Sequence, residues 1–502
     1  MSIQLFQSLH TSKFKLLSLW GFLVLFIWKT VFFPGEVKST SFKRMREEIP
    51  TYFKLSVDAN THNDYGLNYP VTYQFSIPSG SSNLKAYKKY TKDGIWAQIN
   101  EKSSLNFFNG IEAVRFDYAN NKAYISVAFN EMSDNIFLKV TDEFENPVAV
   151  YDKITKYYDN RKAAVVFSAD DWDGNSTVDS KFQEACDMFA SKKIWLSVGV
   201  ITKHQSPPIW SHIQSKIDKG CIEVDSHSRT HPRLPYNDYD SEIRGSKEDI
   251  IENLDLPTLY KKGLQEYVWG WIAPYGYSNA SIRSELGKCK YISDVCDPYA
   301  VRNGDFPDWD AVNGLYKQWN RWSFVECKPL RKLNSEFDER INRGKIYHLG
   351  FHPAQLNFTP GSKIDQHTDH LKGRKDLWYA GSGALMVYHY MEDQDIITIK
   401  ECRKGELLDI FCCPNPCYLA EGQIVKFAKL PSSVEKICIY TIAGELVRSL
   451  ENGDGLMKNT DTTNAIWNCR NSNGKKVARG VYIYVIISSC GEREKGTIAI
   501  IR

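Results

Sequence analysis

The chain has 502 residues, and its composition already excludes several classes of protein. Hydrophobic residues make up 42% and charged residues 25%, which is typical of a globular chain and excludes a disordered or collagen-like one. There are 63 Lys and Arg against 60 Asp and Glu. The net charge of +3 therefore gives no electrostatic reason to expect nucleic acid as a partner. A chain of this length predicts about two to four domains.

An apolar run over residues 16–28 predicts a targeting segment near the amino terminus. The run is long enough for the hydrophobic core of a signal peptide and short for a full membrane span. Lys13 and Lys15 precede it and more basic residues follow it, a distribution that by the positive-inside rule favours a cytoplasmic body. We predict a signal peptide or a membrane anchor over 1–33, then a basic linker over 34–50.

Residues 51–158 are predicted to form a β-rich domain. Short runs with alternating character, such as 71–77 and 123–129, are separated by turn signals such as the Pro-Ser-Gly at 78–80. This pattern favours a small sandwich of strands. It carries no motif that indicates a function.

The next segment, residues 159–401, changes to alternating apolar strands and amphipathic helices. The order strand, helix, strand, helix, strand is predicted for residues 163–167, 180–191, 194–201, 210–219 and 221–224. Such alternation indicates a parallel sheet or a barrel with helices around it.

Acidic and imidazole side chains follow three predicted strands of this segment. Asp170 and Asp171 follow the first strand, His227 and His231 follow the third, and His352 follows a later one. Chemistry in α/β folds gathers at the carboxyl ends of strands. One of two adjacent carboxylates can bind a metal while the other acts as a base, and two histidines four apart can grip one cation. Each pattern alone is also typical of a solvated turn or of hydrogen-bonded core histidines.

Two further features of the segment bear on catalysis. Tyr275 lies in a Pro-Tyr-Gly turn, whose backbone N–H groups can face an oxyanion. His352, at a strand end, is suited to proton transfer near neutral pH. His367 and His370, near the end of the segment, are predicted to be surface residues.

These motifs, in this order, resemble those of the polysaccharide deacetylase (NodB-homology) family, carbohydrate esterase family 4. The resemblance covers residues 159–401 and implies an α/β fold, a distorted (β/α)7 barrel. It also implies a bound metal, Zn²⁺ or another divalent transition metal. Carried across residue by residue, it makes Asp171, His227 and His231 the metal ligands.

The resemblance implies catalytic roles as well. Asp170 would be the general base and His352 the general acid, and the backbone N–H of Tyr275 would stabilise the oxyanion. Trp309, in the Asp-x-x-Asp-Trp segment at 305–309, would wall the acetyl pocket.

Three more positions are compared with the family's motifs. Leu349 resembles the residue that lines the acetyl pocket. The sequence departs from the family at Trp172, where the family has Gly, and we expect Trp172 to contact substrate. It departs again at Ile272, where the family has an Arg that holds the catalytic Asp by charge. Arg229 is the candidate to take over that role.

Residues 408–502 are predicted to form a second β domain. The Ala-Gly turn at 443–444, the Trp-containing motif at 467–474 and the Gly-Val-Tyr-Ile-Tyr run at 480–484 resemble the flagellar-hook-capping-type (FlgD-like) immunoglobulin-like domain and the type IX secretion sorting domains. This resemblance implies an Ig-like β-sandwich on an exported protein, with cell-surface attachment and a secretion machinery as partner. Of the 12 cysteines, we expect some in local disulfides and others as buried thiols.

Together the two resemblances imply an exported, membrane-anchored or cell-surface hydrolase. It would use a metal to remove N-acetyl groups from a GlcNAc-type polysaccharide, acting on carbon–nitrogen bonds that are not peptide bonds. Two alternatives stay open. One is a catalytically degenerate carbohydrate-binding surface protein, and the other is an O-acetyl esterase acting on xylan-like polymers.

Overall fold

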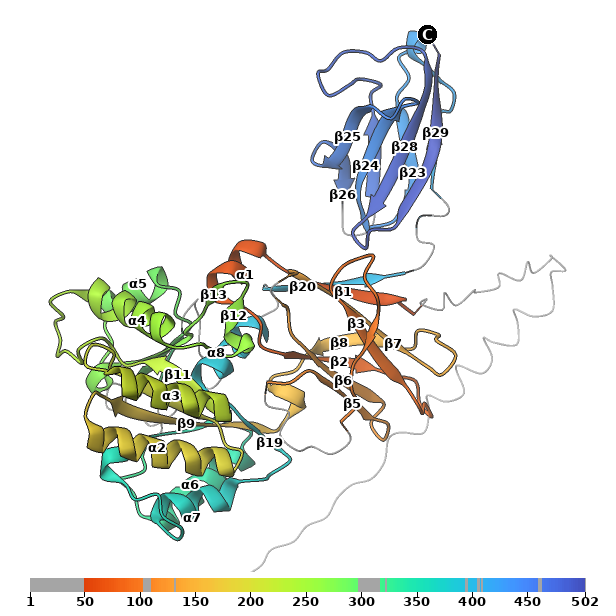
Figure 1. Ribbon diagram of the computed structural model, residues 1–502. Helices are drawn as coiled ribbons and strands as arrows, with labels where there is room; N and C mark the ends of the chain where they lie inside the picture. Colours follow the sequence, from red (N-terminus) through yellow and green to blue (C-terminus); the bar gives the residue numbers. More distant parts are fainter. Residues whose placement is uncertain are drawn as a thin grey trace, which may run out of the picture. The chain divides into compact units, whose positions relative to one another are not determined.

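The computed structural model (Figure 1) describes residues 49–102, 110–130, 132–296, 317–320, 323–392, 396–403, 407, 410–458 and 463–501. The predicted targeting segment, most of the predicted linker, and Trp309 with its motif lie outside these residues. Within the described ranges, no helix is long and apolar enough to cross a membrane. Contacts between residues divide the chain into two units, residues 1–48 and residues 49–502.

A curled parallel sheet forms the centre of the predicted α/β segment. Its strands lie in the order β16-β15-β14-β11-β10-β9-β18-β17, and β19 pairs with β9 as well. They are β9 (Ala163–Trp172), β10 (Leu196–Val200), β11 (Ile222–Ser226), β14 (Gly270–Ile272), β15 (Ser293–Cys296), β16 (Lys317–Asn320), β17 (Ser323–Phe324), β18 (Tyr347–Phe351) and β19 (Leu377–Tyr379). The predicted parallel sheet is therefore confirmed. In the described part of the chain β16 and β17 are not paired, so the sheet is a half-barrel and not a closed (β/α)7 barrel.

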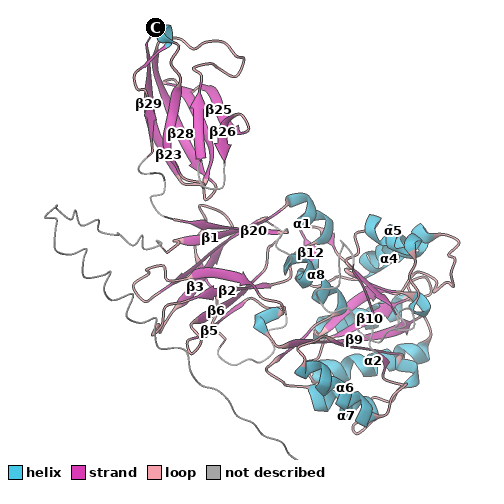
Figure 2. Cartoon of the chain, turned by 180° about the vertical axis from the view of Figure 1, so that it is seen from behind, coloured by secondary structure: helices cyan, strands magenta, loops and turns pink. Residues whose placement is uncertain are grey.

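Helices cover the sheet, as Figure 2 shows in cyan against magenta strands. They are α2 (Ser176–Ser191), α3 (Pro207–Lys219), α4 (Ser246–Asn253), α5 (Ala280–Lys288), α6 (Leu330–Asn342), α7 (Lys363–Leu371) and α8 (Ser382–Glu392). The predicted helices 180–191 and 210–219 correspond to α2 and α3. Each begins about one turn earlier, because Asn175 caps α2 through its side chain and α3 starts with Pro207 in its first turn.

The amino-terminal region consists of two antiparallel sheets and one short helix. Their orders are β20-β1-β7-β3-β4 and β5-β6-β2-β8. The elements are β1 (Tyr52–Val57), α1 (Ala59–Tyr65), β2 (Val71–Ser76), β3 (Lys85–Lys89), β4 (Ala97–Gln98), β5 (Ala113–Asp117), β6 (Lys122–Val127), β7 (Asn135–Thr141), β8 (Val150–Ile154) and β20 (Ile397–Cys402). Strand β20 ends the predicted α/β segment in sequence but pairs with β1, so it belongs to this region's sheet.

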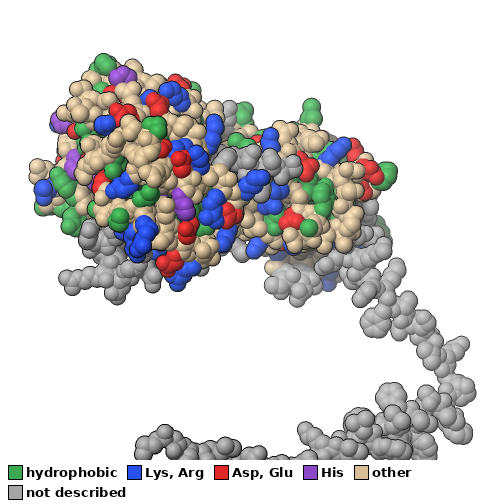
Figure 3. Space-filling model, turned by 90° about the horizontal axis from the view of Figure 1, so that it is seen from below, with side chains coloured by type: hydrophobic (Ala, Val, Ile, Leu, Met, Phe, Trp, Pro, Cys, Tyr) green, Lys and Arg blue, Asp and Glu red, His purple; other side chains and the backbone are tan. Residues whose placement is uncertain are grey.

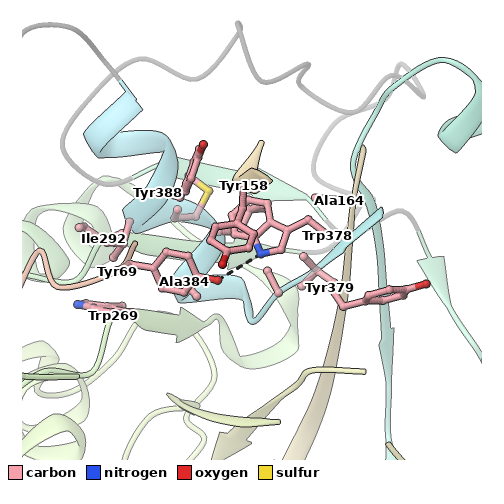
Figure 4. Packing of buried hydrophobic residues seen from close by; sticks show 14 of the residues in the cluster. Tyr69, Tyr158, Ala164, Trp269, Ile292, Trp378, Tyr379, Ala384 and Tyr388 are labelled. Atoms are coloured by element: carbon pink, nitrogen blue, oxygen red, sulfur yellow. Dashed lines mark hydrogen bonds between the residues drawn. The ribbon is translucent and has the colours of Figure 1, made fainter. Parts of the chain in front are cut away.

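One hydrophobic core joins the amino-terminal region to the half-barrel. Figure 4 shows Tyr69 and Tyr158 of the first packed against Trp378 and Tyr388 of the second. The indole N–H of Trp378 donates to the hydroxyl of Tyr69 at 3.2 Å, so these two buried polar groups are paired. The segment 51–158 thus shares its core with the half-barrel that carries the site.

The carboxyl-terminal region is all β and has a hydrophobic core of its own, which includes Trp467. Its strands lie in the order β21-β23-β27-β26-β25-β24-β28-β29-β22. They are β21 (Phe411–Cys413), β22 (Cys417–Tyr418), β23 (Val425–Leu430), β24 (Val434–Thr441), β25 (Leu446–Asn452), β26 (Gly455–Lys458), β27 (Thr463–Trp467), β28 (Gly480–Ser488) and β29 (Arg493–Ile501). A disulfide links Cys402 of β20 to Cys490 in the turn between β28 and β29.

Candidate metal centre and active site

A bulge at the carboxyl end of β9 presents the two adjacent carboxylates. Along β9 and β10, two residues, Asp170 and Asp171, lie opposite one, Gly199. Asp171 has a φ of 72°, in the left-handed region that non-glycine residues rarely adopt. A bulge re-aims the side chains of the strand that carries it. Here Asp171 faces the loop after β11, while Asp170 is nearly fully buried.

The loop after β11 brings His227 and His231 to Asp171. Oδ1 of Asp171 lies 3.1 Å from Nε2 of His227 and 3.3 Å from Nε2 of His231. One ligand atom from each of the three residues lies within 4.8 Å of the others. The predicted ligand set therefore converges on one point.

Hydrogen bonds around the two imidazoles suit them to a cation. Nδ1–H of His227 donates to the carbonyl of Ile272 at 2.8 Å, which holds the ring with Nε2 facing Asp171. Nε2 of His231 is buried and makes no hydrogen bond to any described residue. Ser228 accepts the backbone N–H of His231 at 2.8 Å and so helps to fix its position. Two ring nitrogens and a carboxylate oxygen that face one another are best satisfied by a divalent cation between them.

The charges of the three groups depend on one another. Partial burial alone would raise the pKa of Asp171, but the hydrogen bond and charge of His227, with the charges of His231 and His352, hold it well below its ordinary value. Burial, reinforced by the charge of His227, lowers the pKa of His231 to about 4. Asp171 is therefore ionised and His231 neutral near pH 7, which are the forms that bind a metal.

His352, directly after β18, lies on the other side of Asp171. Its Nε2 is 3.8 Å from Oδ2 of Asp171, and its Nδ1 is 3.1 Å from Oε1 of Glu326. The ring stacks on Phe324 with 5.2 Å between centroids. Burial alone would lower the pKa of His352, but the hydrogen bond to Glu326 and the nearby carboxylates raise it above its ordinary value. The imidazole is thus held as a proton donor whose Nε2 faces the site.

Tyr275 borders the site through its ring. It lies in the 3₁₀ turn Pro274–Gly276 with a φ of 55°. The turn's own hydrogen bonds are donated by Gly276 and Tyr277, so the turn does not use the N–H of Tyr275. The ring packs 4.5 Å from that of His231, between centroids, and Arg233 stacks on it.

A pocket of about 420 Å³ opens beside these groups. It is lined by residues from the end of β9, from α2 and from the loops after β9, β10, β11 and β18, among them Asp170, Asp171, His231 and His352. A cavity of this size holds a sugar ring and its substituents. The predicted catalytic residues and two of the predicted metal ligands therefore line one pocket.

The side chains of three other residues named in the sequence analysis do not line this pocket. Trp172 and Leu349 are fully buried, so neither side chain reaches a ligand at the surface, which corrects the prediction that they contact substrate. The guanidinium of Arg229 pairs with Asp249 at 3.0 and 3.1 Å, so it does not take the place of the family's arginine at Asp170.

Glu326 is not among the predicted site residues, and the predicted surface position of His367 is wrong. Glu326 follows β17, a strand of two residues, and too short a strand leaves no hydrophobic pattern to mark its end. His367 is fully buried, not at the surface. The signal was available, since Ile364, His367 and Leu371 recur at helical spacing on the buried face of α7.

No protein-family model matches this sequence, and a search of curated proteins finds no match. Three solved structures match parts of this chain. A family 4 acetyl xylan esterase from Clostridium thermocellum, solved with a cobalt ion, matches 41% of this chain and 81% of its own at 13% identity and a TM-score of 0.26. The deacetylase domain of BpsB from Bordetella bronchiseptica matches 37% and 72%, respectively, at 12% identity and a TM-score of 0.22.

The third structure is PorZ of Porphyromonas gingivalis, described as a surface component of the type IX secretion system. It matches 22% of this chain at 23% identity and a TM-score of 0.17, and this chain spans only 14% of PorZ. At these identities and TM-scores the three matches carry no argument about function.

Proposed function

We propose that this protein is a metal-dependent hydrolase that removes N-acetyl groups from a polysaccharide of GlcNAc type. The observation that carries the proposal is the convergence of Asp171, His227 and His231, with Asp170 and His352 in the same pocket. These residues come from three strand ends that are far apart in sequence, and each has a chemical part in amide hydrolysis.

The ligand set fits Zn²⁺ or another divalent transition metal. Two imidazoles and one carboxylate are a common set for catalytic zinc, and they leave positions open for water and substrate. When bound, such a cation polarises the acyl oxygen and lowers the pKa of water. Asp171, His227 and His231 would hold it.

Asp170 and His352 carry the proton transfers. Asp170 would accept a proton from the attacking water as the new carbon–oxygen bond forms. The N–H of Tyr275 would donate to the oxygen that gains negative charge. Nε2–H of His352 would then protonate the sugar nitrogen as the carbon–nitrogen bond breaks, since an unprotonated amine is a poor leaving group. Acetate and a free amino sugar result.

The alternatives differ in what His352 must do. An O-acetyl esterase acting on a xylan-like polymer expels an alkoxide, which depends less on protonation than an amine does. The contact between His352 and Glu326 keeps the imidazole protonated near neutral pH and therefore supports the amide substrate. A catalytically degenerate carbohydrate-binding protein has no need of a converged ligand set.

Acetate release tests the proposal. We expect acetate from N-acetylglucosamine oligomers in the presence of Zn²⁺, little after chelation, and none from Asp170→Asn with metal still bound. Faster release from O-acetylated xylan would favour the esterase. Oligomer binding without any acetate release would favour the degenerate protein.

Location and partners belong to the same proposal. An exported protein at the cell surface, membrane-anchored or held by a secretion machinery, would meet an N-acetylated polysaccharide directly. The disulfide between Cys402 and Cys490 supports an oxidising compartment. On the face seen in Figure 3, basic and acidic side chains are interspersed and form no large patch of one sign. Fractionation of cells with a tagged chain tests the location, and recovery in the cytoplasm would contradict it.

A further inference from the structure

We propose that Trp172 and Asp179 position the metal ligand Asp171 by anchoring the bulge that carries it. The inference rests on the metal site of the proposed function, and it assigns a role to the residue that directly follows that ligand. Both are positioning residues, because neither is one of the three metal ligands Asp171, His227 and His231.

The bulge is a strained feature that needs support. Asp171 has a φ of 72°, which costs free energy for a residue with a Cβ atom and persists only where surrounding contacts hold it. The space opposite the bulge is tight as well. A Cβ on Gly199 would lie 3.2 Å from Cβ of His227 and 3.1 Å from Cδ1 of Ile272. The β10 residue opposite the bulge therefore packs closely against the metal ligand His227 and has no room for a side chain.

Trp172 fixes the chain immediately after the bulge. Its side chain is fully buried and stacks on Phe182 with ring centroids 4.6 Å apart at 19°. Its carbonyl accepts the N–H of Ile201 at 3.0 Å and the side chain of Gln205 at 2.6 Å. Backbone and side chain are thus both tied to the scaffold, and the residue before them has little freedom to turn.

Asp179 completes the anchor from the first turn of α2. Its Oδ1 accepts the indole N–H of Trp172 at 3.1 Å, and its Oδ2 accepts from His212 and Gln183, both at 2.8 Å. The carboxylate is nearly fully buried, so it is held in one orientation by three donors. Through Trp172, α2 therefore determines where β9 ends and where Asp171 points.

The test measures binding of Co²⁺ by titration, with the visible spectrum of the bound ion as the readout. Trp172→Phe keeps an aromatic ring to stack on Phe182 and removes the N–H, together with the second ring of the indole. We expect this variant to bind Co²⁺ with a dissociation constant about tenfold higher and to alter the visible spectrum of the bound ion. Loss of a group that orients a metal ligand has effects of this size. Asp179→Leu, which removes the acceptor, should do the same. The double variant should bind Co²⁺ little more weakly than Asp179→Leu alone, because both changes remove the same hydrogen bond between Trp172 and Asp179.

Trp378→Phe is the matched control. Trp378 is also fully buried and also donates its N–H to a side chain, the hydroxyl of Tyr69, within the core shared with the amino-terminal region. It should lower the melting temperature to a similar degree and leave Co²⁺ binding unchanged.

Wild-type Co²⁺ affinity in both Trp172→Phe and Asp179→Leu would overturn the inference alone. Absence of Co²⁺ binding by the wild-type protein would overturn it together with the metal site. Weakened binding in a protein that releases no acetate would support the inference while removing the proposed function.

Discussion

Glu326 accepts hydrogen bonds from both the backbone N–H and the ring Nδ1 of His352, the latter at 3.1 Å. Two bonds to one carboxylate hold the imidazole against rotation. They also fix the tautomer, because a proton on Nδ1 leaves Nε2 directed toward the pocket. The strands before these residues, β17 and β18, are parallel neighbours, so the contact follows from the sheet itself.

Glu326→Gln should slow deacetylation while metal binding stays intact. Gln keeps the size of the side chain but stabilises the imidazolium less, so we expect kcat for an N-acetyl substrate to fall about 10²-fold. The loss should be smaller for an O-acetyl substrate, since an alcohol needs less help to leave. Kinetics on both substrates measure the ratio. An equal loss on the two would mean that Glu326 acts on folding or binding and not through proton donation.

Metal binding should stabilise the folded protein. A ligand that binds only the native state raises the free energy of unfolding, by about 2.7 kcal/mol at a free concentration of 100 times its dissociation constant. We expect Zn²⁺ to raise the melting temperature of the wild type and not that of His227→Ala. His370→Ala is the control, because His370 is part-exposed, pairs with Asp338 and lies outside the site. A rise of equal size in His227→Ala would place the ion elsewhere.

The strand ends and the metal ligands could be predicted from the sequence, because each is marked by a pattern of only a few consecutive residues. Asp170 follows an apolar run, and parallel strands bring their carboxyl ends to one edge, so convergence with His227 and His352 was accessible from sequence. The buried position of Trp172 was not accessible from sequence, because a bulge leaves no trace in the alternation of hydrophobic residues. One extra residue in a strand reverses the face on which the next side chain lies.

Pairing between strands far apart in the chain could not be predicted from the sequence either. Nothing within residues 397–402 indicates that β20 pairs with β1, because that register is set by the finished sheet. The contact between Glu326 and His352 could not be predicted for the same reason, since it depends on β17 lying beside β18. Ile272 was identified only as a departure from a motif. Its backbone carbonyl, which orients His227, would be present with any side chain.

The disulfide between Cys402 and Cys490 should stabilise the carboxyl-terminal region. It closes a loop with a sequence separation of 88 residues, for which the chain-entropy relation gives about 4–5 kcal/mol. Cys402→Ser should therefore lower the melting temperature of this region in the oxidised protein. The same substitution should have no effect once both proteins are reduced. Peptide mapping without reductant checks the linkage, and free thiols at both positions would contradict it.

His367 should make the protein less stable in acid. Burial, with the nearby charge of His370, lowers the pKa of His367 to about 3, whereas an unfolded histidine titrates near 6.5. Between these values the unfolded chain binds a proton that the folded chain does not, so stability is fully present above about pH 6.5 and is lost as the pH falls toward 3. The slope is about 1.4 kcal/mol for each pH unit in that window. His367→Gln should unfold with a shallower dependence of the free energy of unfolding on pH, measured by urea titration at several pH values. His370→Ala should keep most of the wild-type slope, and an unchanged slope in His367→Gln would show that other groups cause the acid sensitivity.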